Sequence, residues 1–373
     1  MPRAFRPTDL VSEQPTSALA LTYERPTVRV DEQDLAEVSE LMLSLEMTEK
    51  EGGLSALEMR VSNVSSSDDG QSTFAFEDDS VLKLGAHITI YSGDVIAPCE
   101  IFRGTITALE ADFPEGDAPT LLVLAEDDFQ RARMARRTAL HENVTIADVA
   151  RDLASQLGLT PVVTGLTSNI GTQVQFNESD LAFLRRMLAR YDGDLQVVGT
   201  ELHVSPRADV SRGTIELQLH SQLRRARVTA DLAHQVTEIT VRGWDVSQGE
   251  AVSGSSTGAN LGPGAGRNGS DVLRDAIGER SERISHLAAT TQDEAQAIAD
   301  AAFDSRARRF VAVDATADGN PALRVGTIVT LRGLGGRFEN DYYVTLARHR
   351  WDEQRGYETD FSAESAFLGA GGP

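Results

Sequence analysis

Histidine, cysteine and clustered acidic residues are the side chains in this sequence that could bind metal ions or catalyse a reaction. Zinc sites place histidines or cysteines at short fixed spacings, as in HExxH, because several ligands must reach one ion. The single cysteine, Cys99, cannot build a thiolate site or an intramolecular disulfide. No zinc spacing occurs among the seven histidines, which are His87, His141, His203, His220, His234, His286 and His349. The sequence therefore predicts no metal-binding residue.

Runs of acidic residues suggest a second chemistry, acid–base catalysis. The runs are Asp68-Asp69, Glu77-Asp78-Asp79 and Glu126-Asp127-Asp128. Catalytic carboxylates of glycosidases are usually distant in sequence and face each other across a cleft. These runs lie at expected strand ends and turns, where acidic side chains are normally solvated. The Gly-x-Ser-x-Gly spacing of serine hydrolases occurs once, at 254–258, within a segment whose Gly/Ser-rich composition is typical of a linker. We therefore expect no catalytic residue and no enzymatic activity.

The glycine-rich segment at 262–266 has the composition of a phosphate-binding loop. Such a loop follows a strand and leads into a helix, often through Gly-Lys-Ser/Thr, and this context is missing here. The surrounding residues 247–270 are rich in Gly, Ser and Asn, which is typical of a loop or mobile linker. We expect a linker, and no cofactor-binding residue.

The net charge of −22 is concentrated in the first third of the chain. Residues 1–130 carry 8 basic and 26 acidic side chains, a net charge of −18. This balance argues against nucleic-acid binding, which needs cations for the phosphates. It is compatible with a basic partner surface.

Arginines form three clusters in the remaining two thirds of the chain. The clusters are Arg131, Arg133, Arg136 and Arg137, then Arg224, Arg225 and Arg227, and finally Arg306, Arg308 and Arg309. Each cluster is either a solvated face or a contact with acidic residues of a neighbouring subunit, since the arginine fork suits carboxylates. The sequence leaves both interpretations open.

The elements that would position these residues are mostly short strands. Apolar or alternating runs occur at 27–30, 41–47, 57–61, 87–91, 102–109 and 120–124, separated by turn residues. Further strand-like runs occur at 214–219, 235–244, 310–313, 327–331 and 342–349. Many short strands at this spacing favour small barrels or sandwiches.

Three helices interrupt the strand pattern. Thr145 with Asp148 and Thr291 with Glu294 have the spacing of capping boxes, and Ser179 begins a third apolar stripe. Gly158 is placed to end the first helix and Gly193 the second. A hairpin is expected at 195–204, with its turn at Gly199-Thr200.

Two distant stretches of the chain repeat one pattern. Residues 82–90 read LKLGAHITI and residues 323–331 read LRVGTIVTL, so that Leu, a base, an apolar residue and Gly recur in step. Each copy is followed by a second similar strand, at 105–108 and 343–346. We interpret this as the duplication of one β module, which would let three subunits present six similar modules.

Several motifs resemble the phage late control gene D family. They lie at 102–106, 125–129, 145–159, 177–186, 241–245 and 319–326, with 342–344 and His349. The most specific are the Glu-Ser-Asp-Leu start of the second helix and Gly-Asn-Pro-Ala-Leu-Arg-Val-Gly. The match covers about residues 20–365.

This resemblance implies a baseplate hub of contractile tails and contractile injection systems, similar to the N-terminal part of VgrG spike proteins. The hub is expected to be a homotrimer that joins a hexameric inner tube protein to a trimeric spike. VgrG chains continue into an OB-fold and a β-helical needle, so the spike is expected here as a separate protein. Other baseplate proteins are further expected partners.

The expected fold is α+β and mainly β, with two antiparallel barrels and an α+β insertion. The boundaries are an arm at 1–18, a barrel at 19–128, the insertion at 129–206, a second barrel at 207–246 and 308–366, a Gly/Ser loop plus helix at 247–307, and a tail at 367–373. The sequence shows neither a signal peptide nor an apolar run long enough for a membrane helix. We expect assembly in the bacterial cytoplasm, as part of a phage tail or injection particle.

Two other functions stay open at this point. One is a cell-envelope hydrolase carried at the hub, which would release peptidoglycan fragments. The other is a carbohydrate-binding protein at a tail tip, although an aromatic content of 6% offers few stacking platforms.

Overall fold

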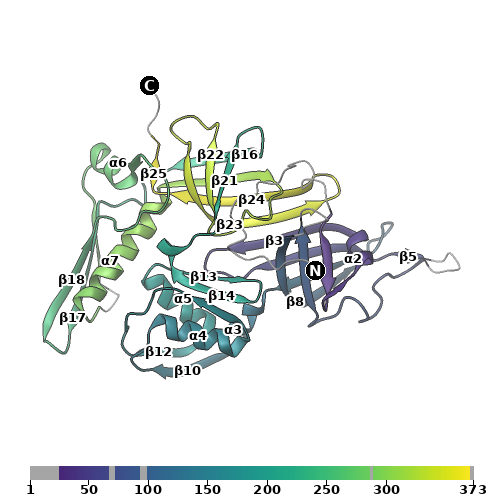
Figure 1. Cartoon of the computed structure of the whole chain (residues 1–373), viewed down its shortest axis with the longest axis horizontal. Helices are drawn as coiled ribbons and strands as arrows, with labels where there is room; N and C mark the ends of the chain where they lie inside the picture. Colours follow the sequence, from purple (N-terminus) through teal and green to yellow (C-terminus); the bar gives the residue numbers. More distant parts are fainter. Residues whose placement is uncertain (1–24, 67–71, 93–98, 286–288, 370–373) are drawn as a thin grey trace.

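The computed structural model of the chain describes residues 25–66, 72–92, 99–285 and 289–369 (Figure 1). Within these residues the fold is mainly β, with one 13-stranded sheet and several sheets of two or three strands. The expected arm at 1–18 and His286 lie outside the described residues. Two β modules, each followed or interrupted by an α+β segment, make up the chain.

The first module contains six principal strands and one short helix. The strands are β1 (Thr27–Val30), β3 (Met42–Lys50), β4 (Ala56–Ser62), β7 (His87–Ser92), β8 (Cys99–Asp112) and β9 (Thr120–Glu126). Helix α2 (Ala36–Glu40) and the short strands β2 (Gln33–Asp34), β5 (Ser65–Ser66) and β6 (Ser72–Thr73) lie between them. In β4, alternate residues Leu57, Met59 and Val61 are buried, because a strand with one face on the core buries every second side chain.

The second module also contains six principal strands. They are β15 (Thr214–Gln218), β16 (Leu223–Ala230), β21 (Val311–Asp318), β22 (Ile328–Arg332), β23 (Asn340–Asp352) and β24 (Gly356–Ser365). Its core is separate from that of the first module and includes Phe310, Val313, Leu331, Val344 and Phe361.

The two modules have the same strand order. In chain order their strands correspond one to one, and in space the order is β1-β7-β8-β9-β4-β3 in the first and β15-β22-β23-β24-β21-β16 in the second. The pairings are antiparallel in both modules with one exception. β15 pairs parallel with β22, whereas the equivalent strand β1 pairs antiparallel with β7. The duplication inferred from the sequence is therefore present in the topology.

Register and irregularities also repeat between the modules. His87 is opposite Thr105 in the first module, and Ile328 is opposite Tyr343 in the second. The β8–β9 ladder shifts register between Ile106 and Ala108, and the β23–β24 ladder shifts between Val344 and Leu346. The β3–β4 and β16–β21 ladders shift at equivalent places as well, between 42 and 44 and between 223 and 225. Bulges at matching positions are specific features of a strand pair, so they support true duplication.

The repeated Leu-base-apolar-Gly motif forms the same turn in each module. Gly85 has φ +85° and Gly326 has φ +87°. The N–H of Gly85 donates to the carbonyl of Ile106 at 2.9 Å, and that of Gly326 donates to Val344 at 2.9 Å. A positive φ of this size favours glycine because a Cβ atom strains the left-handed conformation.

These two glycines give a matched pair of substitutions. Gly85→Ala adds a methyl group with no atom within 4 Å, so only backbone strain of about 1–2 kcal/mol is expected. Gly326→Ala has the same strain, and its Cβ would lie 2.5 Å from Nη1 of the buried Arg212 and 2.8 Å from Val210. We expect Gly326→Ala to cost about 1–3 kcal/mol more in the free energy of unfolding, measured by urea denaturation. Equal losses for the two variants would contradict this account.

One continuous sheet joins the modules, and none of the sheets formed by the described residues closes into a barrel. The path runs β16-β21-β24-β23-β3-β4-β9-β8-β7-β1-β2, with β22 also on β23. The two barrels expected at 19–128 and at 207–246 with 308–366 are therefore corrected to two open halves of one sheet. The reason is that β3 pairs with β23 of the other module instead of closing its own.

The first α+β segment covers the region expected as an insertion. It contains α3 (Arg131–Met134), β10 (Arg136–His141), α4 (Ile146–Leu157), β11 (Thr160–Val163), β12 (Gln173–Ser179), α5 (Asp180–Arg190), β13 (Gly193–Val198) and β14 (Glu201–Pro206). The hydroxyls of Thr145 and Ser179 accept hydrogen bonds at the starts of α4 and α5, as expected from the sequence. Gly158 ends α4 in the left-handed conformation, but α5 ends at Arg190, before Gly193.

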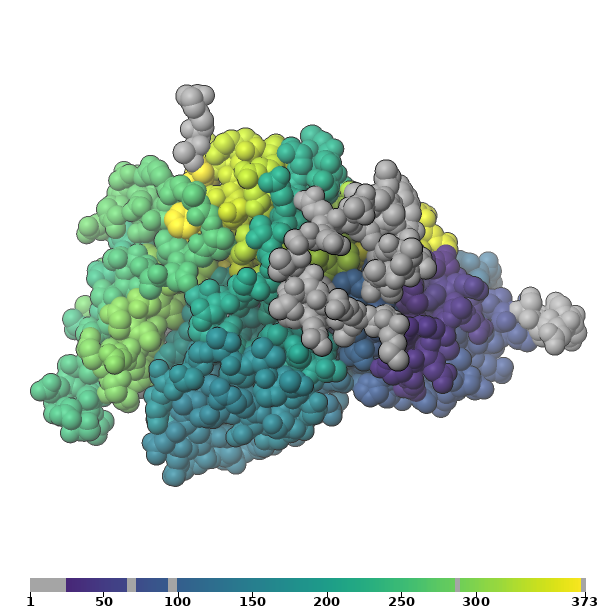
Figure 2. Space-filling view, in the orientation of Figure 1, coloured from purple at the N-terminus to yellow at the C-terminus, as the bar shows by residue number. Residues whose placement is uncertain are grey.

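The second α+β segment lies between β16 and β21. It contains β17 (Glu238–Asp245), β18 (Glu250–Ser256), β19 (Arg267–Asn268), α6 (Gly269–Ala276), β20 (Ser281–Ile284) and α7 (Gln292–Ala307). The β17–β18 hairpin packs on α7 and its tip projects from the rest of the molecule (Figure 2). Thr291 caps α7, as predicted from its capping box.

Two expectations for this region are corrected. The strand expected in the second barrel at 235–244 pairs with β18 and β20 in a separate sheet, because its apolar residues pack on α7. The linker expected at 247–270 contains β18, and Phe367–Leu368 of the expected tail form strand β25 on β19. The glycine-rich composition predicted a linker, but glycine has a packing role here. Without a Cβ atom, Gly254 allows β18 to pack directly on the backbone of α7. Among the described helices, none is long and apolar enough to cross a membrane.

The joint between the modules as the candidate functional site

Strand β23 is the element that joins the two modules. Its residues 340–343 pair with β22, and residues 343–352 pair with β24. On its other edge, residues 346–352 pair antiparallel with residues 44–50 of β3. Figure 1 shows β23 and β3 side by side where the yellow and purple parts of the sheet meet. A 13-residue strand can serve both modules because one half of this edge pairs with β22 of its own module and the other half pairs with β3 of the first module.

Two aromatic residues of the second module complete the core of the first. Trp351 at the end of β23 and Tyr357 at the start of β24 are 4% and 0% exposed and belong to the first module's core cluster. Arg25 stacks over Trp351, with its guanidinium carbon 5.0 Å from the ring centroid. The end of the β23–β24 hairpin is therefore inserted into the neighbouring module.

A buried ion pair crosses the joint beneath this hairpin. Arg324, which follows Leu323 in the repeated motif, pairs through Nε with Glu49 on β3, and both side chains are almost fully buried. His349 lies close to it, with Nδ1 2.7 Å from the Tyr357 hydroxyl. Burial and, to a smaller extent, the charge of Arg324 lower the pKa of His349 to about 3. His349 is therefore neutral and structural at neutral pH.

A second buried arginine connects three parts of the chain. Arg207, after β14, pairs with Glu51 of the first module and at 2.7 Å with Glu364 on β24. Its guanidinium carbon also lies 3.9 Å from the ring centroid of Tyr343. Burial lowers the pKa of Arg207, but the two carboxylates outweigh burial, so the net pKa is raised and Arg207 stays charged.

Further arginines fix the insertions to the joint. Arg212 donates to the carbonyl of Val325 at 2.7 Å and pairs with Asp194 on β13 at 3.0 Å. Arg308, after α7, pairs with Asp192. Breaking one partner of a buried pair is costly, because the other charge remains desolvated. These contacts make the joint a rigid polar connection between the modules.

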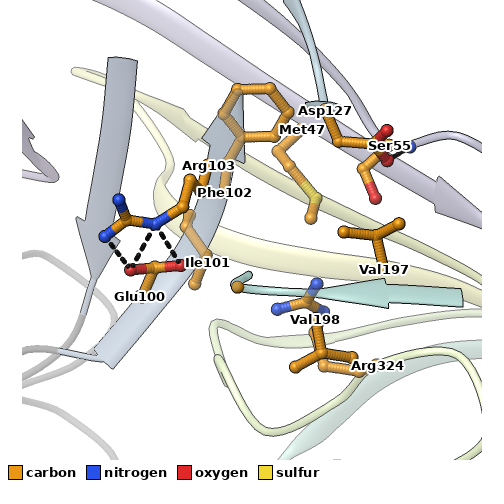
Figure 3. Close-up of a pocket in the computed structure, with 11 residues that line it drawn as sticks. Met47, Ser55, Glu100, Ile101, Phe102, Arg103, Asp127, Val197, Val198 and Arg324 are labelled. Carbon is orange, nitrogen blue, oxygen red and sulfur yellow. Dashed lines mark hydrogen bonds and ion pairs between the residues drawn. The ribbon is translucent and has the colours of Figure 1, made fainter. Parts of the chain in front are cut away.

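A small cavity lies against the joint (Figure 3). Its volume of about 20 Å³ holds about one water molecule and is far below that of a substrate pocket. Its lining includes Arg324, Asp127, Val198 and Glu100, which forms an ion pair with Arg103 at 2.9 Å. The cavity is a small gap between packed elements and offers no room for a small-molecule substrate.

Asp127 is buried in this region, contrary to the solvated role expected for the run at 126–128. Its carboxylate accepts hydrogen bonds from the N–H groups of Ser55 at 2.6 Å and Phe129 at 3.0 Å. Burial raises the pKa of Asp127 to about 7, although both hydrogen bonds act in the opposite direction. Its role is to hold the start of the first insertion against the turn after β3.

A groove of about 460 Å³ runs over the outer face of the second module near the joint. Four arginines line it, from strands β16 and β23: Arg225, Arg227, Arg348 and Arg350. Arg348 pairs with Glu46 of the first module at 3.1 Å, and Arg350 pairs with Glu358 at 2.8 Å. Arg225 and Arg227 are exposed, and neither forms an ion pair within the described residues.

Half of the clustered arginines form ion pairs within the chain, a role that the sequence interpretation did not include. Arg137 pairs with Asp180, Arg224 with Asp318 at 2.6 Å, and Arg308 with Asp192. Arg133 and Arg306 pair with Glu126 and Glu282. Except for Glu126, these partners lie more than 20 positions away in sequence, so the clusters alone gave no signal for them.

The other residues considered for chemistry are dispersed. In the described part of the chain, no three His, Cys, Asp or Glu side chains form a group that could hold a metal ion. The glycine-rich loop at 262–266 packs against the start of β23, where Asn340 exchanges hydrogen bonds of 2.9 Å with the backbone of Ala265. His141 stacks on Phe183 inside the first insertion.

The family model described as the Alg8 N-terminal domain matches residues 27–353, which include the first module, both insertions and the second module except for β24. The chain belongs to this family. The matched range runs from β1 to the end of β23, and so includes the β3–β23 pairing of the joint. No curated protein matches the sequence.

Solved structures of phage tail proteins share this fold. The 43 kDa tail protein of prophage MuSo2 from Shewanella oneidensis has a TM-score of 0.67 and 14% identity, covering 91% of this chain and 97% of that chain. A tail protein from Neisseria meningitidis MC58 has a TM-score of 0.65 and 10% identity, covering 91% and 96%.

A secretion-system protein also shares the fold. The E. coli c3393 protein is described as a type VI secretion component with structural similarity to the T4 bacteriophage tail proteins gp27 and gp5. Its TM-score is 0.54 and its identity 13%, covering 94% of this chain and 80% of that chain. At these identities the likeness establishes a shared fold. This member of the Alg8 N-terminal domain family therefore has the fold of tail proteins.

Proposed function

We propose that this protein is the baseplate hub of a contractile injection machine. In this role it forms a homotrimer that joins the hexameric inner tube to a trimeric spike, alongside other baseplate proteins. The fold of phage tail proteins and the sequence resemblance to the late control gene D family both support the proposal. The role is structural, without catalysis.

The observation that carries the proposal is the duplicated module. Strand order, register and bulges are shared by the two copies, so each chain offers two nearly equivalent units. Three chains then present six units toward a sixfold tube and remain threefold toward a spike. Closed symmetry of this kind is the usual organisation of soluble assemblies.

The joint gives the proposed hub its rigidity. The modules share a sheet, an inserted Trp351 and the buried Arg324–Glu49 pair, so their relative orientation is fixed within a chain. An adapter between two rings needs this property, because a flexible connection would let the six units lose their spacing.

The proposal predicts the mass of the protein in solution. Light scattering of the purified protein is expected to give the mass of three chains, about 121 kDa from a chain mass of 40.3 kDa. The trimer should also bind separately purified tube protein and spike protein. A chain that stays monomeric in the presence of both partners would exclude the hub role.

A further inference from the structure

The strands that form the joint within one chain have equivalents elsewhere in the sheet, on β8 and on β16, whose matching edges are unpaired in the described residues. β23 occupies the same position in the second module as β8 does in the first, and β16 occupies the same position as β3. Residues 346–350 of β23, which pair with β3, correspond to residues 108–112 of β8, which pair only with β9. Residues 44–49 of β3 correspond to residues 225–230 of β16, which pair only with β21. Within the described residues, both of these strand edges therefore lack a partner strand.

We propose that these two edges pair with each other between neighbouring copies of the chain. The far half of β8 in one copy lies antiparallel to β16 of the next, as β23 lies to β3 within a chain. This inference rests on the proposed trimer and names the contact that builds it. β8 and β16 lie on opposite sides of the joint (Figure 1), so one chain cannot make the pairing itself.

The register of the β23–β3 pairing within a chain predicts the register of the β8–β16 pairing between copies. His349 is opposite Met47, and their equivalents are Ala111 and Val228. Arg350 is opposite Glu46, and their equivalents are Asp112 and Arg227. The proposed contact therefore places Ala111 opposite Val228 and Asp112 opposite Arg227 of the next copy.

Charges at the two edges are complementary in this register. Within the chain, Arg348 pairs with Glu46 at 3.1 Å. The equivalent residues are Glu110 and Arg227, so the ion pair recurs with its signs exchanged. Arg225 and Arg227 are the exposed arginines of the groove without an ion pair in the described chain, and the edge of β8 is acidic. Opposite charges across an interface select the partner and its register.

An exposed phenylalanine occupies the position of the inserted tryptophan. Phe113, just after β8, corresponds to Trp351. Trp351 is 4% exposed in the neighbouring module, whereas Phe113 is 63% exposed. Phe113 contacts Phe74, itself 46% exposed, in an edge-on pair with ring centroids 5.7 Å apart. In the proposed contact Phe113 packs on the next copy near Ala226, the equivalent of Leu45, which is opposite Trp351 within the chain.

Free strand edges next to an exposed aromatic pair are typical of surfaces that add another strand. The contact joins two different surfaces, β8 of one copy and β16 of the next. Each copy therefore contacts one neighbour through β8 and another through β16. Such a head-to-tail contact closes into a ring when the rotation between copies permits it. Three copies then give a ring of six modules with similar joints.

Cysteine cross-linking tests the proposed register in the full-length chain. Ala111→Cys with Val228→Cys, in a Cys99→Ser background, should give covalent dimers and trimers on a non-reducing gel after mild oxidation, with no larger species. The control joins Ala111→Cys to Ala226→Cys, two residues away on the same side of β16, and should cross-link at least about tenfold less because disulfides need Cα atoms within about 7 Å.

Removal of Phe113 gives an independent measurement. Phe113→Ala should weaken trimer formation at least about tenfold in sedimentation or light scattering, as buried aromatic anchors dominate interfaces. Phe176→Ala removes another phenylalanine, 76% exposed on β12, and should leave the trimer unchanged. Both residues are exposed in the chain, so both variants are expected to fold.

The outcomes separate this inference from the proposed function. A trimer that forms no cross-link between 111 and 228, and tolerates Phe113→Ala, would overturn the strand pairing and leave the trimeric hub intact. A protein that is monomeric in every condition would overturn both. Cross-linked species beyond three chains would mean that the edges pair in an open filament, which contradicts the closed ring.

Discussion

Replacement of Arg324 by methionine is expected to lower the free energy of unfolding by about 3–5 kcal/mol. The substitution keeps the unbranched stem but leaves the carboxylate of Glu49, 2% exposed in its side chain, without its cation. An unpaired charge in this position stays desolvated, and water cannot reach it without opening the joint. Urea denaturation followed by tryptophan fluorescence measures the loss, since Trp351 lies in the same joint.

The repeat supplies a matched control for this prediction. Lys83 occupies the position of Arg324 in the first copy of the motif, but it pairs with Asp31 at 3.3 Å with both side chains nearly half exposed. Lys83→Met should therefore cost less than about 1 kcal/mol. Combining Arg324→Met with Glu49→Leu removes both buried charges and should recover most of the stability. Similar losses for Arg324→Met and Lys83→Met would show that the buried pair is unimportant.

Acidification is expected to destabilise the protein through His349. Its pKa falls from 6.5 in the unfolded chain to about 3 in the folded one, because burial and the nearby Arg324 disfavour the charged imidazole. The unfolded state therefore binds a proton between these pH values and the folded state does not. The contribution of neutral His349 is complete above pH 6.5 and is lost progressively as the pH falls toward 3, by up to about 5 kcal/mol.

The slope of stability against pH tests this assignment. His349→Asn keeps a polar atom near the Tyr357 hydroxyl but cannot titrate, so the free energy of unfolding should fall less steeply between pH 6 and 4 than in the wild type. His220→Asn is the control, because His220 is exposed with φ +64°, a conformation that asparagine tolerates. The same slope in wild type and His349→Asn would place the acid sensitivity elsewhere.

Local signals in the sequence predicted the three longest of the described helices, α4, α5 and α7, but not α2, α3 or α6. Thr145, Ser179 and Thr291 each cap a helix through the side-chain hydrogen bond that their position indicated. Capping depends on a few neighbouring residues, so it needs no knowledge of the rest of the chain. Most short strands of the first module were predicted for a similar reason, since their apolar residues alternate.

Two strands of the second module were missed, and their composition explains why. β24 alternates Glu358, Asp360, Ser362 and Glu364 on one face with Tyr357, Thr359 and Phe361 on the other, so its apolar pattern is weak. In β16 the arginines favour an interpretation as a charge cluster, so the sequence does not indicate a strand there. Both strands are stabilised by their neighbours in the sheet more than by their own residue types.

The burial of charged residues at the joint could not be predicted from local patterns. Glu49 and Glu51 appear in the sequence as part of an acidic segment, and Arg207 and Arg324 as isolated bases. Their pairing depends on contacts between residues more than 150 positions apart. Sequence spacing carries no information about such contacts without a second sequence for comparison.

The sequence by itself determined that one β module occurs twice, because the repeated Leu-base-apolar-Gly turn needs the same residue types wherever it forms. The tertiary structure decided what each copy does. The base of the motif is solvated at Lys83 and buried against the other module at Arg324, and the aromatic at the hairpin end is exposed at Phe113 and inserted at Trp351. The physical reason is that β3 meets β23 within the chain, whereas the equivalent edges of β8 and β16 have no neighbouring strand in the described structure.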